Sequence, residues 1–72
     1  MQYAIVIETA PGSSNYSAYV PDLPGCITTG CTIEEVKHNM QEAIELHLEG
    51  LREGGLPIPE PSTQVATIEV AA

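Results

Sequence analysis

The side chains best suited to hold a metal ion in this chain are two cysteines and two histidines, Cys26, Cys31, His38 and His47. Two thiolates and two imidazoles can form a tetrahedral zinc site. His38 and His47 lie in one segment with helical periodicity. A separation of nine residues there turns the second side chain by about 900°, which is half a turn out of phase. Because the imidazoles point to opposite sides, we expect no zinc site and interpret both cysteines as small apolar fillers.

Three carboxylates on or near predicted strands, Glu8, Asp22 and Glu69, could hold Mg²⁺ for phosphoryl chemistry. A nuclease of this kind would need to attract an anionic substrate, and this chain carries a formal net charge of −8 at pH 7. Its sequence contains neither a nucleophile elbow nor a glycine-rich phosphate loop. We therefore expect no catalytic residue, no bound metal and no cofactor, and interpret the protein as a non-enzyme.

The charge balance also restricts the partners. Ten acidic residues stand against two basic ones. Nucleic-acid binding takes most of its affinity from lysine and arginine, and anionic membrane surfaces attract the same residues. The composition therefore argues against direct nucleic-acid binding and against membrane association. It favours a basic protein as partner.

Length and the N-terminus set further bounds. Seventy-two residues with three tyrosines and no phenylalanine or tryptophan predict a single domain, residues 1–72, with a thin core. Such chains often gain stability by self-association, so we expect a homo-oligomer. Residues 1–8 lack the basic start and the long apolar run of a signal peptide. We expect a cytoplasmic protein with reduced thiols.

The side chains named above must be positioned by secondary structure, and the first part of the chain is predicted to form three strands. Residues 2–9 are apolar on both faces, which favours a central strand. Residues 16–20 form a second strand and residues 26–29 a third. Between them, Pro24 presets the first central position of a turn, and Gly25 supplies the positive φ that a type II turn requires at the second.

A helix is predicted over residues 33–53. Thr32 is its expected N-cap, Glu35 completes a capping box, and Gly54 and Gly55 end it. Gly50 should lower the stability of the helix by about 1 kcal/mol relative to alanine. We expect the close approach of another backbone to explain a glycine at this position. At about 100° per residue one sector is apolar. The opposite side holds Glu34, Glu35, His38, Glu42, Glu45, Glu49, Arg52 and Glu53. Such a face is usually only solvated, but it can equally steer a basic partner.

After a proline-rich connector, residues 64–70 alternate apolar and polar side chains, which predicts a last strand. The fold class is therefore α+β with the order β-β-β-α-β. A right-handed crossover would place the fourth strand parallel to the first, giving the strand order 3-2-1-4 with the helix on one face.

Over residues 3 to about 70, the chain resembles the HicB family of antitoxins. The residues that carry the resemblance are Tyr16-x-Ala18, Pro21-Asp22-Leu23-Pro24-Gly25-Cys26, Gly30-x-Thr32, Glu35, Asn39, Glu42-Ala43, Leu48, Gly55 and Pro57-Ile58-Pro59-x-Pro61. Cys31 stands where the family often has aspartate, so the helix start depends more on Thr32. Many members carry a C-terminal DNA-binding module; with this chain ending at Ala72, we expect a short form without it.

The resemblance implies a partial ribonuclease-H-like fold and a role as an antitoxin. Such a protein neutralises a small basic HicA toxin, a ribonuclease, by covering its active site. The surfaces expected to bind the partner are the turn and the acidic side of the helix, namely Pro21, Asp22, Leu23, Pro24, Gly25, Glu42, Glu45 and Glu49. The alternative is a stand-alone homo-oligomeric regulatory or structural domain with no toxin partner.

Overall fold

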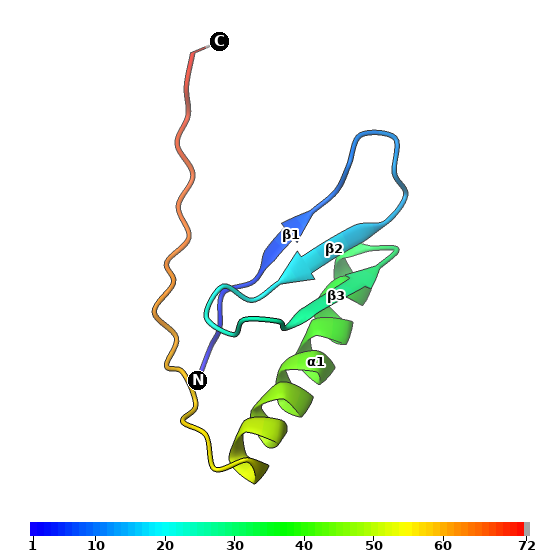
Figure 1. Cartoon of the computed structure of the whole chain (residues 1–72). Helices are drawn as coiled ribbons and strands as arrows, with labels where there is room; N and C mark the ends of the chain where they lie inside the picture. Colours follow the sequence, from blue (N-terminus) through cyan, green and yellow to red (C-terminus); the bar gives the residue numbers. More distant parts are fainter. Residues whose placement is uncertain (72) are drawn as a thin grey trace.

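The computed structural model describes residues 1–71 and arranges them as a small sheet with one long helix against it (Figure 1). The strands are β1 (Val6–Glu8), β2 (Tyr16–Tyr19) and β3 (Ile27–Gly30), and the helix is α1 (Ile33–Glu53). The sheet is antiparallel in the order β1-β2-β3, with Ile7 opposite Ala18 and Ala18 opposite Thr28. The predicted α+β class and antiparallel meander are therefore confirmed.

The core lies between the sheet and α1. Its fully buried residues are Ala18, Val20, Leu23, Cys26, Val36 and Met40. The sheet contributes Ala18 and Val20, which alternate with exposed residues along and just beyond β2. The helix contributes Val36 and Met40, which lie one turn apart on the same side. Partly buried side chains extend this core; they come from the N-terminal segment and β1, from the start of β2 and from the middle of α1.

Two successive turns join β2 to β3 and bury Leu23 between them. The N–H of Leu23 donates to the carbonyl of Val20 at 3.1 Å, and the N–H of Cys26 donates to the carbonyl of Leu23 at 3.0 Å. Gly25 has φ +85°, as predicted for the second central position of a type II turn. A third bond, from the N–H of Val20 to the carbonyl of Cys26 at 3.1 Å, closes the pair.

Both ends of α1 are capped as predicted. The hydroxyl oxygen of Thr32 accepts from the N–H of Glu35 at 3.0 Å. The Glu35 carboxylate accepts in return from the N–H of Cys31 at 3.1 Å, one residue before the expected partner. At the other end Gly55 has φ +67°, and the N–H of Leu56 donates to the carbonyl of Leu51 at 2.9 Å. This bond satisfies one of the last helical carbonyls.

The predicted fourth strand is wrong, and with it the strand order 3-2-1-4. The described residues contain three strands, and residues 56–71 belong to none of them. Pro57, Pro59 and Pro61 keep the chain extended without donating N–H groups. Beyond them the chain runs away from the sheet (Figure 1), so its alternating side chains have no strand beside them.

The prediction that the first strand is central is wrong for the same reason, because β1 is an edge strand. It is also shorter than predicted. Pairing joins Val6 to Tyr19 and Glu8 to Ser17, and the residue after Tyr19 already begins the turn. Residues before Val6 therefore have no partner on β2 and belong to no strand.

The close backbone approach expected at Gly50 occurs at Gly30 instead. A Cβ added at Gly30 would lie 2.8 Å from the backbone nitrogen of Val36 and 3.1 Å from its Cα. A Cβ added at Gly50 would meet nothing within 4 Å. Gly30 thus lets the end of β3 lie directly against the first turns of α1. Gly50 destabilises the helix as any internal glycine does, and no close contact requires a glycine there.

These two glycines give a matched test. We expect Gly30→Ala to lower the free energy of unfolding by about 1–3 kcal/mol, because the backbone of α1 must move. Gly50→Ala should raise it by about 0.5–1 kcal/mol through helix propensity. Urea unfolding at one protein concentration, followed by circular dichroism, measures both. Equal effects of the two substitutions would contradict the packing described here.

Candidate functional site

The outer side of α1 is a continuous acidic surface. Its residues, hereafter the acidic face, are all exposed: Glu34, Glu35, His38, Glu42, Glu45, Glu49, Arg52 and Glu53. They lie outward because Val36 and Met40 hold the opposite side of the helix against the sheet. Six carboxylates against one arginine make this side strongly negative, as the helical periodicity predicted.

Local contacts within the acidic face leave its carboxylates accessible. The Nε2 atom of His38 lies 3.1 Å from Oε1 of Glu42, one turn along the helix, with both side chains mostly exposed. Gln41 donates weakly to Glu45 at 3.4 Å. These four side chains line a shallow hollow. Each exposed pair contributes little by itself, but the summed field of the face attracts cations over a longer range.

The turn residues predicted to bind a partner have different roles in the structure. Leu23 is completely buried and belongs to the core. Asp22 is half-buried and its carboxylate is occupied within the chain. Pro21 is half-buried, while Pro24 and Gly25 are exposed at the tip. The turn thus leaves Pro24 and Gly25 exposed and uses Leu23 and Asp22 for the fold.

Asp22 fastens the C-terminal part of the chain to this turn. Its Oδ2 accepts from the N–H groups of Ser62 and Thr63 at 3.0 and 3.1 Å, and its Oδ1 accepts from their hydroxyls at 3.0 and 2.8 Å. The hydrogen bonds from the Thr63 hydroxyl and backbone, then those from Ser62, hold the pKa of Asp22 below its ordinary value of 3.8. The Tyr3 hydroxyl donates to the carbonyl of Pro59 nearby.

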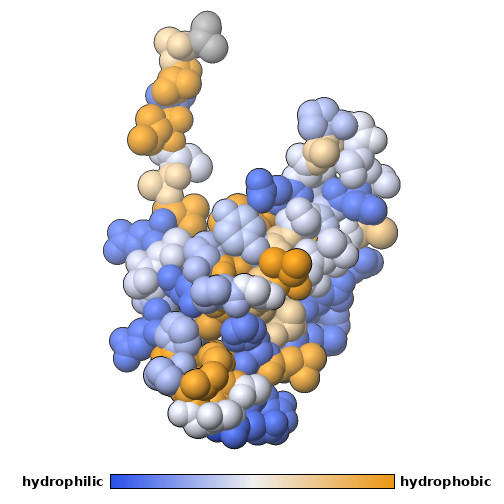
Figure 2. Space-filling view, in the orientation of Figure 1, coloured by the Kyte–Doolittle hydropathy of each residue, from blue (hydrophilic) through white to orange (hydrophobic). Residues whose placement is uncertain are grey.

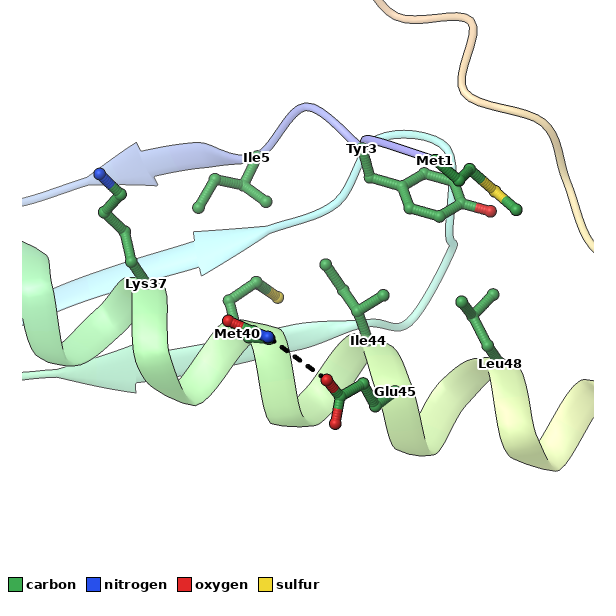
Figure 3. Close-up of a pocket in the computed structure, with 9 residues that line it drawn as sticks. Met1, Tyr3, Ile5, Lys37, Met40, Ile44, Glu45 and Leu48 are labelled. Atoms are coloured by element: carbon green, nitrogen blue, oxygen red, sulfur yellow. Dashed lines mark hydrogen bonds between the residues drawn. The ribbon is translucent and has the colours of Figure 1, made fainter.

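A second surface, which the sequence did not reveal, is an open groove between the start of the chain and α1 (Figure 3). Tyr3 and Ile5 reach into it from the β1 side, and Ile44 and Leu48 point toward them from the helix. The groove measures about 570 Å³. Its full lining, hereafter the groove, is Met1, Tyr3, Ile5, Lys37, Met40, Gln41, Ile44, Glu45 and Leu48.

The cysteines differ in their surroundings. Cys26 is buried with its Sγ 4.0 Å from Sδ of Met40, and burial raises the pKa of its thiol, as suits the predicted apolar filler. Cys31 is exposed, so the same interpretation is wrong for it.

Within residues 1–71 no three histidine, cysteine, aspartate or glutamate side chains are grouped to hold a metal ion. In the same part of the chain, no helix combines the length and apolarity needed to cross a membrane.

Comparison with known proteins places this arrangement in a family. The family model described as the HicB_like antitoxin of bacterial toxin-antitoxin system matches residues 3–71. A UPF0150 protein of Thermoplasma acidophilum is 35% identical over 68 residues, which cover 94% of this chain and 97% of that protein. A protein from the rep-hol intergenic region of Haemophilus phage HP1 is 40% identical over 60 residues, covering 83% of this chain and 44% of that protein.

Another relative, a UPF0150 protein of Thermotoga maritima, is 43% identical over 47 residues. The match covers 65% of this chain and 63% of that protein, so the chain spans about three fifths of that relative's length. Among solved structures, a chain of the HicA3 and HicB3 toxin-antitoxin complex matches with a TM-score of 0.71 and 32% identity. This match covers 86% of the present chain and 70% of the other.

The Asp22 contacts predict a pH-dependent attachment of residues 62–63. Because the folded pKa is depressed, the carboxylate stabilises the attachment fully above its ordinary value of 3.8 and loses this effect as pH falls through the lowered pKa. The amide chemical shifts of Ser62 and Thr63 should therefore titrate with a midpoint below 3.8. Asp22→Asn should speed hydrogen exchange of both amides by roughly tenfold. The control Glu60→Gln should leave them unchanged; equal exchange in Asp22→Asn and wild type would contradict the attachment.

Proposed function

This chain belongs to the HicB-like antitoxin family, a non-enzymatic family, and we propose on that basis that it neutralises a small basic HicA-type ribonuclease by covering its active site. The toxin would be its physiological partner, in the cytoplasm. The structural likeness to a chain of the HicA3 and HicB3 complex supports this partner class. The observation that carries the proposal is the acidic face of α1.

A ribonuclease must bind the phosphates of RNA, so its active site needs positive charge. Glu42, Glu45 and Glu49 follow one another at intervals of three and four residues and span about 10 Å of helix. The helix is fixed by its buried side, so these carboxylates are presented without a change of backbone. In this proposal they occupy the positions that RNA phosphates would take in the toxin.

Charge alone would give a fast but weak complex, because exposed ion pairs contribute about 0–1 kcal/mol each. Leu46 supplies an apolar contact beside them. It is 69% exposed and lies four residues after Glu42 and three before Glu49, at the border of the acidic face. We propose Leu46 as an apolar anchor in the interface, with Pro24 and Gly25 of the turn as further contacts. Sequence reasoning missed Leu46, because only charged residues and histidine were assigned to the outer side of the helix.

A second candidate function is a stand-alone homo-oligomeric domain with no toxin partner. Exposed apolar residues outside the acidic face, notably Val65, Ile68 and Val70, favour self-association. The two functions separate in one experiment. The antitoxin binds the short basic protein encoded beside its gene and relieves the growth arrest that this protein causes on co-expression. A stand-alone domain does neither.

The contribution of charge can be measured with matched variants. We expect Glu42→Gln, Glu45→Gln and Glu49→Gln together to weaken binding of that basic protein by about tenfold or more in low salt, with a smaller difference at high salt. The control replaces Glu8, Glu60 and Glu69 by glutamine and thus changes the net charge equally. Isothermal titration calorimetry at two salt concentrations gives the comparison. Equal losses in the two triple variants would reject the acidic face as the contact surface.

Leu46 allows a complementary test. Leu46→Ala should weaken the same complex by about tenfold at both salt concentrations, because it removes apolar contact area rather than charge. Ile27→Ala is the control, since Ile27 is 71% exposed on β3, away from the acidic face. Wild-type affinity for Leu46→Ala would remove this side chain from the interface.

A further inference from the structure

The last residues of the chain form an extended arm with apolar side chains in solvent. We use the term arm for residues 64–71, which follow the attachment of Ser62 and Thr63 to Asp22. Val65, Ile68 and Val70 are 71%, 86% and 76% exposed. Figure 2 shows the arm projecting from the body with apolar residues along it. Among the described residues, no backbone hydrogen bond joins the arm to any other segment.

The sheet has an unpaired edge beside the groove, where a further strand could bind. β1 is an edge strand, so one side of its backbone has no strand partner. Ile7 lies opposite Ala18, which is buried against α1, so Ile7, Ile5 and Tyr3 share the face toward the helix. The groove lies between these residues and Ile44 and Leu48 of α1 (Figure 3). A strand added beside β1 would cover the groove and pair with the free edge.

We propose that two copies of this chain exchange their arms, each arm adding as a fourth strand to the β1 edge of the other copy. The exchange is reciprocal, so both copies use the same surfaces, as a twofold symmetric dimer requires. It supplies a sheet partner for the arm and covers the groove in a single contact.

The side-chain pattern of the arm fits this position. Ala66, Ile68 and Val70 alternate with Val65, Thr67 and Glu69. Placed beside β1, the first three side chains face the groove and the other three face away from it. Residues 64–70 extend over about 23 Å, which is comparable to the length of residues 1–8 when extended. The exchanged strand is therefore long enough to cover the free edge together with the groove.

Charge favours a second copy over a basic protein as the occupant. Two chains with a net charge of −8 repel one another, so a contact between them costs least where both surfaces carry little charge. The arm carries one charged residue, Glu69, and the groove balances Lys37 against Glu45. A basic partner is drawn instead to the carboxylates of the acidic face, on another side of α1.

The structure also explains why the arm does not fill the groove of its own chain. Asp22 holds Ser62 and Thr63 at the turn between β2 and β3, and Tyr3 holds Pro59. The arm leaves this anchored point away from the edge of β1 (Figure 1). The anchors therefore direct the arm outward, where a second copy can take it.

Sedimentation velocity of the purified chain alone, from 1 to 100 µM, tests the exchange and needs no toxin. We expect wild type to dimerise and Ile68→Glu to raise the dissociation constant at least tenfold. Ile27→Glu is the matched control, because it adds the same charge at another exposed isoleucine and should dimerise like wild type. Ile68 makes no core contact, so circular dichroism should show both variants folded.

Hydrogen exchange of the arm amides provides the second readout. In the proposed dimer, arm amides become protected as the protein concentration rises, and Ile68→Glu loses this protection. Three results would overturn the proposal: a wild-type monomer at 100 µM, dimers that tolerate Ile68→Glu, or arm protection that does not depend on concentration, which means pairing within one chain. Because the chain is studied alone, failure here leaves the antitoxin proposal intact.

Discussion

The contact between Leu23, Val36 and Met40 is the interaction on which the rest of this structure depends. These are the largest fully buried side chains, and they join the turn after β2 to the inner side of α1. A chain of this length buries only about 60% of the surface that its unfolded form exposes, so no second core can replace this one. With the inner side of α1 held there, six glutamates face solvent and the middle of the helix borders the groove.

Two kinds of surface therefore meet along one helix. The acidic face is highly charged, and the groove is mostly apolar, with one side chain of each charge, Lys37 and Glu45, in its lining. Glu45 borders both, since it lines the hollow on the acidic face and also the groove. In our proposals a cationic toxin binds the first surface and a second copy binds the other. Apart from Glu45, which both surfaces share, the two contacts use different sides of α1, so a dimer can present two acidic faces at once.

Local signals in the sequence predicted the local structure well. The spacing of Thr32 and Glu35 predicted the helix start, and Pro24-Gly25 predicted the turn, because each signal joins groups only three residues apart. The exposure of Glu42, Glu45 and Glu49 followed from helical periodicity in the same way. These features need no knowledge of the distant parts of the chain.

Features that depend on distant residues were not predictable. Alternation in residues 64–70 describes the two faces of a strand but does not say which strand lies beside it. Asp22 meets Ser62 and Thr63 across about 40 residues, and no spacing rule connects them. Leu23 is expected from the family resemblance to bind the partner with the rest of its turn, yet it is completely buried in the core. Gly30 and Gly50 look alike in sequence, and only the packing of β3 on α1 distinguishes them.

The central claim is that the acidic face takes the place of RNA in the active site of a basic ribonuclease. The most direct measurement is the steady-state rate of RNA cleavage by the toxin at several concentrations of RNA and of this chain. The account predicts competitive inhibition, in which more RNA restores the full rate. Inhibition that more RNA does not relieve, or a ternary complex of toxin, RNA and this chain, would contradict it.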